Sequence, residues 1–232
     1  MSDIGGDYNS FFDCYNVALE EVKLFVFENM MYFREKNSIG CMNSYRIKSL
    51  KSITRKLKEK KTKSICDIAG IRVVFCDKCD EKDLSVLDRQ IRNLDKAGFI
   101  ARFDDIVARS GNVDIDIITD FSVYLCERAE YEKDLKIIID EKKNYIKHPK
   151  DSGYQSLHMI ISYKGVPVEL QIRNLAQHYF AEYEHEKRYK ADENTRVEYN
   201  SICNECAKML SDICGEEVDR SKSIGAKSLK IG

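Results

Sequence analysis

The chain has little proline, almost no net charge and no long apolar run. Only two of its 232 residues are proline, so few points are forced to interrupt helices or strands. Lys and Arg number 38 against 39 Asp and Glu, which excludes a globally basic nucleic-acid binder but not a local basic patch. The richest apolar window, 22–31, is interrupted by Lys23, Glu28 and Asn29, so no stretch reaches the roughly 20 apolar residues of a membrane span. Residues 1–8 lack the basic start and apolar core of a signal peptide, so we expect a cytoplasmic location and no membrane partner.

Apolar residues are nonetheless sufficient for a buried core. They make up 43 % of the chain, while charged residues make up 33 %, above the usual share of about 25 %. We expect one domain over 1–214. The tail at 215–232 carries few large apolar side chains and is expected to be disordered.

The cysteine pattern favours reduced, structural thiols. Nine cysteines are an odd number in a chain without an export signal. Two Cys-x-x-Cys pairs, Cys76/Cys79 and Cys203/Cys206, could together offer four thiolates to zinc. The pairs lie far apart in the sequence, and neither has the Gly-rich knuckle of a zinc ribbon, so small buried apolar residues are the favoured interpretation.

Hydrophobic spacing predicts helices at both ends of the chain. Apolar residues recur at helical spacing over 10–35, and further helices are predicted over 175–190 and 196–214. A basic segment at 45–61 follows the first helix, and Ser49 or Ser52 can cap a helix within it. Amphipathic spacing predicts another helix over 80–94.

Strands are predicted between these helices. The segment 67–75 is rich in β-branched residues after Gly70, which indicates a buried strand. We also predict strands over 114–119 and 135–140, and a hairpin of 156–163 with 166–172 that turns at Lys164-Gly165. The predicted fold is an α/β (α+β) domain with a mixed, mostly antiparallel sheet flanked by helices, and with N- and C-terminal helical extensions.

Acidic residues on this sheet are candidates for chemistry. Asp67 stands where a loop enters a strand, and alternation places Glu169, Gln171 and Arg173 on one strand face. A lone polar strand face is usually just solvated. An acid, an amide and a guanidinium in register can also hold a metal ion and orient a nucleophile.

Basic and aromatic residues gather in two places. Lys147, His148 and Lys150 surround Pro149, shortly before a turn at Gly153 that leads into Tyr154. A ring on a rigid turn beside lysines suits a nucleotide site, although a buried structural tyrosine is the simpler interpretation. Four more cations precede or enter the first predicted strand, where a solvated helix face is the simpler interpretation; they are Arg46, Lys48, Lys56 and Arg72.

These pieces form an ordered series of motifs. The motifs are Arg46-Ile-Lys-Ser49 with Ser52-Ile-Thr-Arg-Lys-Leu57, Asp67-Ile-Ala-Gly-Ile-Arg72, Tyr145-Ile-Lys-His-Pro-Lys-Asp-Ser-Gly-Tyr-Gln-Ser-Leu-His158, Glu169-Leu-Gln-Ile-Arg173, and Glu184-His185 with Tyr189-Lys190. Over about 45–190 the series resembles the synthetase domain of RelA/SpoT-type alarmone enzymes, in the small, single-domain form. The family's hydrolase domain needs a His-Asp pair, and this sequence contains no His-Asp dipeptide.

The resemblance implies a nucleotidyltransferase-like fold and pyrophosphoryl transfer. ATP would donate its β,γ-diphosphate to the 3′-hydroxyl of GTP or GDP, leaving AMP. Asp67 and Glu169 would hold Mg²⁺, and Glu169 would act as base toward the 3′-hydroxyl. The residues carried over to ATP are Arg46, Lys48, Lys56 and Arg72. Those carried over to the acceptor nucleotide are Tyr154, which would stack on guanine, with Lys147, Lys150, His158, Gln171 and Arg173.

The sequence departs from the family pattern in composition and in spacing. Asp67 and Tyr154 lie about twice as far apart as in typical small synthetases, and the excess is an expected insertion at 95–134. The substituted positions, which put acceptor preference in doubt more than the fold, are Asn144 for Asp, Ser152 for Asn, Gln155 for Arg, Asn174 for Thr and Phe180 for Trp.

Other functions stay open at this point. Some small synthetases of this family place the diphosphate on the 3′ end of tRNA, which needs a basic patch. Such a patch could be supplied by Lys142, Lys143, Lys147, His148 and Lys150. A non-catalytic nucleotide- or RNA-binding module is disfavoured by the presence of Asp67 and Glu169. A nucleotidyltransferase could use the Asp-x-Asp pair at 114–116, but an exposed strand face explains that pair more simply. The family analogy also implies a homo-oligomer, with a tetramer as one form.

Overall fold

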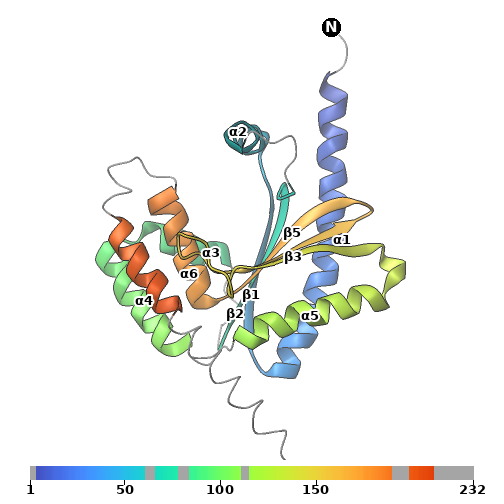
Figure 1. Ribbon diagram of the computed structural model, residues 1–232. Helices are drawn as coiled ribbons and strands as arrows, with labels where there is room; N and C mark the ends of the chain where they lie inside the picture. Colours follow the sequence, from blue (N-terminus) through green and yellow to red (C-terminus); the bar gives the residue numbers. More distant parts are fainter. Residues whose placement is uncertain (1–3, 61–65, 78–83, 111–114, 190–198, 212–232) are drawn as a thin grey trace, which may run out of the picture.

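The structure is a computed structural model that describes residues 4–60, 66–77, 84–110, 115–189 and 199–211 (Figure 1). Its elements are α1 (Ile4–Asn37), β1 (Gly40–Ile47), α2 (Leu50–Lys60), β2 (Ala69–Cys76), α3 (Leu84–Asn93), α4 (Lys96–Ser110), α5 (Ile115–Tyr131), a 3-10 turn (Lys133–Leu135), β3 (Ile137–Asn144), β4 (Leu157–Tyr163), β5 (Val166–Asn174), α6 (Leu175–Glu184), a π-helical turn (His185–Tyr189) and a helix at 199–211. None of the described helices combines the length and the apolar character needed to cross a membrane.

The strands form one five-stranded sheet in the order β1-β2-β5-β4-β3. The pair β2–β5 is parallel, and the other neighbouring pairs are antiparallel. Lys164 and Gly165 join β4 to β5 with positive φ at both residues, 50° and 80°, as a tight hairpin turn requires. The mixed, mostly antiparallel sheet flanked by helices confirms the predicted fold class.

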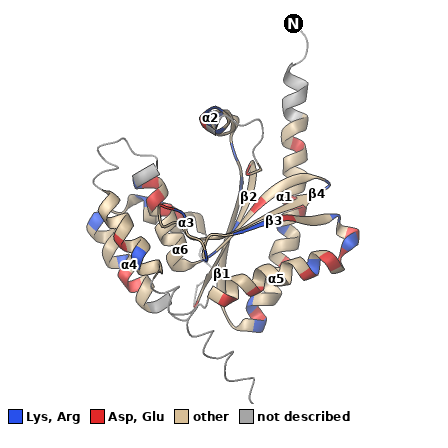
Figure 2. Cartoon of the chain, in the orientation of Figure 1, with Lys and Arg blue, Asp and Glu red and all other residues tan. Residues whose placement is uncertain are grey.

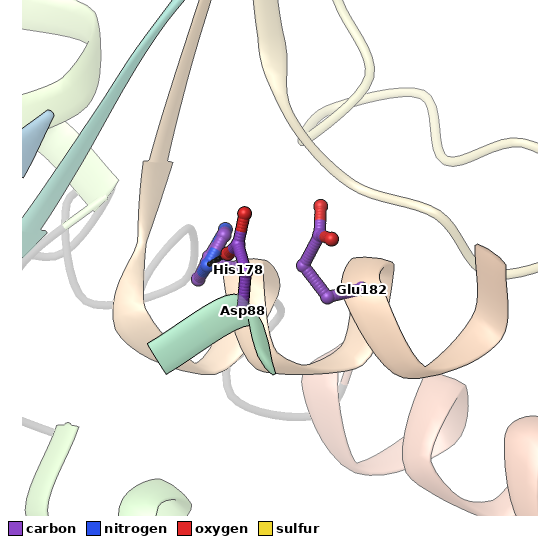
Figure 3. A group of neighbouring side chains, drawn as sticks. All are labelled: Asp88, His178 and Glu182. Atoms are coloured by element: carbon purple, nitrogen blue, oxygen red, sulfur yellow. Dashed lines mark hydrogen bonds and ion pairs between the residues drawn. The ribbon is translucent and has the colours of Figure 1, made fainter. Parts of the chain in front are cut away.

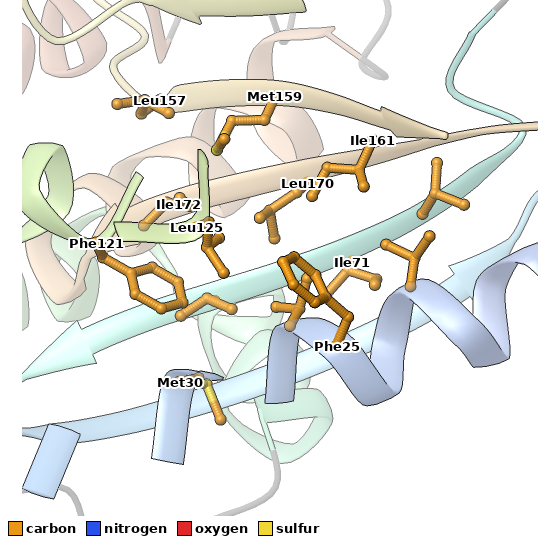
Figure 4. Packing of buried hydrophobic residues seen from close by; sticks show 14 of the residues in the cluster. Phe25, Met30, Ile71, Phe121, Leu125, Leu157, Met159, Ile161, Leu170 and Ile172 are labelled. Carbon is orange, nitrogen blue, oxygen red and sulfur yellow. The ribbon is translucent and has the colours of Figure 1, made fainter. Parts of the chain in front are cut away.

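Strand alternation gives the sheet one apolar face, and α1 and α5 cover it. On β5, Leu170 and Ile172 are fully buried, as is Met159 on the neighbouring β4. These side chains pack against Phe25 of α1 and Phe121 of α5 (Figure 4). The main core therefore occupies one side of the sheet and leaves the opposite side for polar residues.

A second core joins α3, α4, α6 and the helix at 199–211. At its centre the rings of Phe99 and Tyr183 stack with their centroids 3.6 Å apart. A smaller cluster places Leu84 of α3 against Met42 and Val74, which share the polar side of the sheet in the register of β1 and β2. The helices α3 and α6 thus cover one end of that side.

Several segments differ from the sequence prediction, among them α4, for which no helix was predicted, and β3, which ends four residues later than predicted. The strand β1 was not foreseen, because polar residues interrupt its short apolar pattern. The strand predicted over 114–119 is wrong from residue 115 onward, which begins α5. The buried residues Ile115, Ile118, Phe121 and Leu125 follow helical spacing, so their periodicity outweighs the β-branched composition of the segment. Asp114 and the tail at 215–232 lie outside the described residues.

The expected insertion at 95–134 contributes to both cores. Its first part forms α4, whose Phe99 and Phe103 are fully buried in the second core. Its second part forms α5, whose Ile118 and Leu125 are fully buried against the sheet. The extra length is therefore integral to the packing of the described fold.

The described cysteines of the two Cys-x-x-Cys pairs differ in their state. Cys203 and Cys206 form no disulfide and are buried in the second core, where burial raises the pKa of Cys206 to about 12. Cys76 is disulfide-bonded, so the expectation of uniformly reduced thiols is wrong at this residue. Cys79 lies outside the described residues.

The turn before Tyr154 depends on Gly153. Its φ is +83°, and a Cβ placed there would lie 2.1 Å from the Cβ of Ala207 in the helix at 199–211. We expect Gly153→Ala to lower the free energy of unfolding in urea by more than about 2 kcal/mol, because strained φ and steric overlap add. Gly165→Ala is the control, since its φ is +80° with no atom within 4 Å, and it should cost only about 1 kcal/mol. Equal losses for the two variants would contradict this account.

Candidate active site

The candidate site lies on the polar side of the sheet, where neighbouring strands align polar residues. On β5, Glu169, Gln171 and Arg173 share this side. The register pairs Gln171 with Arg72 of β2 on one flank and with His158 of β4 on the other. Directly paired residues project to the same side of a sheet, so three strands contribute to one polar row.

Five side chains of the site form a closed ring of hydrogen bonds; they are Tyr154, His158, Glu169, Gln171 and Arg173. Arg173 Nη2 donates to Tyr154 Oη at 2.5 Å and to Gln171 Oε1 at 2.8 Å. Gln171 Nε2 donates to Glu169 Oε2 at 2.7 Å. His158 closes the ring, with Nδ1 3.1 Å from Glu169 Oε1 and Nε2 2.8 Å from Tyr154 Oη. Residues from β4, β5 and the turn before β4 are thereby locked together.

The ring has an arrangement of protons that keeps His158 neutral. Arg173 can only donate, so the Tyr154 hydroxyl oxygen accepts from it and directs its own proton at His158 Nε2. His158 is then a neutral imidazole that donates from Nδ1 to Glu169. Burial lowers the pKa of His158, which agrees with the neutral form. Glu169 accepts two hydrogen bonds as a carboxylate.

The carboxylate of Glu169 is held in its ionised form. Burial alone would raise its pKa, but the hydrogen bonds from His158 and Gln171 outweigh burial and lower the pKa to about 2. Repulsion from Asp67 acts on the pKa of Glu169 in the opposite sense, so the two carboxylates lie close enough for their charges to interact. An ionised, partly buried carboxylate of this kind can accept a hydrogen bond from a hydroxyl group or bind a hard cation.

Asp67 is bound by two lysines. Lys48 Nζ lies 2.9 Å from Asp67 Oδ2 and donates to its backbone oxygen at 2.6 Å, and Lys56 of α2 also contacts Oδ2. Burial alone would raise the pKa of Asp67, but the hydrogen bonds from Lys56 and Lys48 outweigh burial and lower the pKa to about 2. The helix α2, which supplies Lys56, is rich in Lys and Arg (Figure 2). Both lysines are thus gathered around one carboxylate.

The two arginines that are predicted to bind ATP differ in their surroundings. Arg46 is exposed on β1, and its charge disfavours the protonated form of Lys48 and of Arg72. Arg72 is mostly buried, and its Nη1 lies 2.8 Å from Glu182 Oε1. Arg46 therefore lies close enough to Lys48 and Arg72 for their charges to interact.

The predicted acceptor lysines are not equivalent. Lys150 Nζ lies 4.5 Å from the ring centroid of Tyr154 and 4.6 Å from that of Tyr145, so two rings flank its charge. Lys147 is exposed in the turn after β3, and the structure does not bring it into the hydrogen-bonded ring. Tyr145, which sequence reasoning did not single out, contacts His158 edge to face at 5.0 Å.

The sequence that forms this site matches a known protein family. The sequence profile described as "Region found in RelA / SpoT proteins" matches residues 45–194, more than half of the chain. The chain belongs to the RelA/SpoT family. All predicted site residues, from Arg46 to Arg173, fall inside the matched region.

Family members of known sequence and structure resemble the chain over different extents. It is 32% identical over 107 residues to the GTP pyrophosphokinase YwaC and 37% identical over 70 residues to the GTP pyrophosphokinase YjbM, both from Bacillus subtilis. These alignments cover 43% and 27% of the chain, and only 45% and 32% of the two relatives. The solved small alarmone synthetase 1 from Bacillus subtilis has a TM-score of 0.61 at 21% identity, covering 95% of this chain and 98% of that one. The chain therefore shares that protein's fold.

Several departures from the family pattern have structural roles here. Asn174 caps α6 by accepting from the Gln177 N–H, and the Gln177 side chain accepts from the Asn174 N–H in return. Gln155 is fully buried, and its Oε1 accepts from Gln177 Nε2. Asn144 Oδ1 accepts from the N–H groups of residues 146 and 147, which shapes the turn after β3. These residues fix the backbone around the site.

A cluster that sequence reasoning missed lies beside Arg72. It comprises Asp88 of α3 with His178 and Glu182 of α6, all buried. Asp88 follows the apolar residue Leu84 by four positions, so it lies on the buried stripe of its helix. An acid in an apolar stripe, and a His and a Glu four residues apart, were the available signals.

Proposed function

We propose that the protein transfers the β,γ-pyrophosphate of ATP to the 3′-hydroxyl of GTP or GDP, which forms (p)ppGpp and AMP. The observation that carries the proposal is the hydrogen-bonded ring that contains Tyr154, His158 and Glu169, together with the influence of the Asp67 charge on Glu169. The names of two relatives, both GTP pyrophosphokinases, support the same reaction. Family membership over the site supports the assignment of roles.

The donor side would be built from cations. Lys48 and Lys56 meet at Asp67, and Arg46 and Arg72 carry charges close enough to influence their neighbours. ATP and a guanine nucleotide bring many negative charges together, and these side chains would offset the repulsion in the transition state. Their grouping supports ATP binding at this end of the polar side.

Asp67 and Glu169 fit a divalent cation. Both are ionised carboxylates, both are partly buried, and their charges repel each other. Mg²⁺ prefers one or two carboxylates together with phosphate oxygens, which is the donor set that ATP would complete. When bound, Mg²⁺ would neutralise charge on the transferred diphosphate. Lys48 and Lys56 would then be released from Asp67 toward the phosphates.

Glu169 would act on the acceptor hydroxyl. Its carboxylate would accept the hydrogen bond, and then the proton, of the 3′-hydroxyl as that oxygen attacks the β-phosphorus of ATP. The bond between the β-phosphorus and the oxygen bridging to the α-phosphate breaks, and AMP leaves. A pKa of about 2 makes Glu169 a weak base, so positioning by His158 and Gln171 would supply much of the rate.

Product analysis tests the proposed reaction. The protein is incubated with Mg²⁺ and labelled ATP, and with GTP, GDP or deacylated tRNA as acceptor. We expect AMP and a 3′-diphosphate of the guanine nucleotide. Transfer to tRNA alone would replace the proposal with the tRNA-modifying alternative, and no AMP with any acceptor would refute it.

Tyr154 is proposed to stack on the guanine base. Lys150 lies over its ring, so the base would take that place and release the lysine toward the acceptor's phosphates. We expect Tyr154→Ala to raise the KM for GDP by roughly 5- to 150-fold, equivalent to about 1–3 kcal/mol of stacking. Tyr154→Phe keeps the ring and loses only the contacts to Arg173 and His158, so its KM should stay near the wild-type value. Equal effects of both variants would make Tyr154 structural.

We infer that the chain forms homo-oligomers through α1. Val17, Leu24 and Met31 are spaced seven residues apart and are 53%, 55% and 41% exposed. A seven-residue apolar repeat is typical of a helix that pairs with another helix. Light scattering should show an oligomer for the wild type and a smaller species for Leu24→Lys. A wild-type monomer would refute this assembly.

A further inference from the structure

The buried cluster of Asp88, His178 and Glu182 lies where α3 and α6 meet the polar side of the sheet (Figure 3). His178 Nε2 donates to Asp88 Oδ1 at 2.9 Å, and His178 is fully buried. Arg72 of β2 and Arg92 of α3 complete the group. The cluster therefore links two helices to a strand of the candidate active site.

The cluster has the spacing of a metal site, but its charges argue against one. One ligand atom from each of the three residues lies within 4.8 Å of the others. Arg92 Nη2 lies 2.9 Å from Glu182 Oε2, and Arg72 Nη1 lies 2.8 Å from Glu182 Oε1. Two guanidinium groups thus balance the two carboxylates, so a divalent cation would bring unbalanced positive charge into a buried space.

The histidine is neutral in this setting. Burial lowers its pKa, and the charges of Arg72 and Arg173 act in the same direction, while the hydrogen bond to Asp88 opposes them. A neutral imidazole with its proton on Nε2 can still donate to Asp88. His178 therefore orients the Asp88 carboxylate without adding charge.

The arginine Arg72 is held by two carboxylates from different helices. Its Nη1 lies 2.8 Å from Glu182 Oε1 and 3.4 Å from Asp88 Oδ2. On the sheet, Arg72 is paired with Gln171 of the hydrogen-bonded ring. Holding one terminal nitrogen of a long side chain from two directions restricts the plane of the guanidinium group. The orientation of the guanidinium group is thereby restricted before any ligand binds.

We propose that Glu182 and Asp88 are positioning residues for the ATP donor: they clamp Arg72 so that its guanidinium group is preorganised for the nucleotide. This inference rests on the proposed function. Preorganisation removes the entropic cost of ordering a long side chain when the ligand binds. Loss of the clamp should weaken the binding of ATP in particular, because Glu182 and Asp88 contact Arg72 and are not part of the hydrogen-bonded ring that contains Tyr154.

The test compares charge-removing variants of nearly equal size. Glu182→Gln and Asp88→Asn are assayed for KM and kcat with ATP and with GDP, and an ATP analogue that cannot transfer its pyrophosphate is titrated by calorimetry. We expect the KM for ATP and the Kd of the analogue to rise roughly tenfold, the scale of one lost charged hydrogen bond and one unordered side chain. The KM for GDP should change less than about twofold. Glu130→Gln, an exposed residue of α5, is the matched control.

A double variant separates positioning from general stability. If Glu182 acts through Arg72, then Arg72→Met/Glu182→Gln should bind the analogue no more weakly than Arg72→Met alone. Additive losses, or equal rises in the KM values of both nucleotides, would overturn the proposal. Stoichiometric Zn²⁺ or Mn²⁺ binding that Glu182→Gln abolishes would replace it with a metal site.

The outcomes also distinguish this inference from the proposed function. Wild-type protein that binds the analogue but forms no AMP with any acceptor refutes pyrophosphoryl transfer. The analogue affinities of the variants would still decide whether Glu182 and Asp88 position Arg72.

Discussion

Glu169→Gln is expected to lower kcat for pyrophosphoryl transfer by about 10²–10⁴-fold, the usual contribution of a general base. The substitution removes the negative charge that would accept the proton of the 3′-hydroxyl. It should leave the KM for ATP and GDP within a few fold, because the cations and Tyr154 remain. Initial rates of AMP release at saturating nucleotide measure the effect.

The fold should survive this change because the hydrogen-bonded ring can reverse. With Gln at 169, the amide can donate to His158 Nδ1, and the imidazole can then donate from Nε2 to the Tyr154 oxygen. Thermal unfolding and circular dichroism should match the wild type, and Glu127→Gln, on the exposed surface of α5, should keep full activity. Near-normal turnover of Glu169→Gln would remove Glu169 from the chemistry.

Asp67→Asn should lower the rate of transfer to a similar extent, but for a different reason. The variant loses one carboxylate of the proposed Mg²⁺ site, and it frees Lys48 and Lys56 from their shared partner. We therefore expect a loss in kcat of at least about 10²-fold that extra Mg²⁺ does not restore. Binding of ATP without Mg²⁺ should be as tight as in the wild type or tighter, because two more cations are available to the phosphates.

Isothermal titration with ATP, in EDTA and in Mg²⁺, measures both parts of this expectation. Asp120→Asn, an exposed residue of α5, is the control for removing one negative charge. If Asp67→Asn weakens metal-free ATP binding, the lysines depend on Asp67 for their placement. If the variant keeps its activity, Asp67 is not a metal ligand.

The parts of the site that the sequence predicts are those set by local rules. Alternation along 168–173 places Glu169, Gln171 and Arg173 on one side of a strand, and β5 has this alternation. The Lys164-Gly165 dipeptide predicts the hairpin that pairs β5 with β4, and hence the approach of His158 to Gln171. Ordered motifs then point to the family, which the match over 45–194 confirms.

The parts that the sequence does not predict depend on contacts between distant elements. The buried cluster beside Arg72 joins residues ninety positions apart, since Asp88 and His178 meet only when α3 packs on α6. The segment that becomes α5 carries apolar residues suited to a strand or a helix, and packing against the sheet decides between them. The binding of Lys48 and Lys56 to one carboxylate likewise depends on how α2 is placed beside the segment that leads into β2.

The most direct measurement follows both phosphates of the donor. ATP labelled at the β-phosphorus, and separately at the γ-phosphorus, is incubated with the protein, Mg²⁺ and GDP, and the products are separated. The proposed grouping of Asp67, Glu169 and Tyr154 in one active site predicts that both labels move together to the 3′ position of the guanine nucleotide while unlabelled AMP is released. Label recovered only in ADP and inorganic phosphate, or in unchanged ATP, would contradict it.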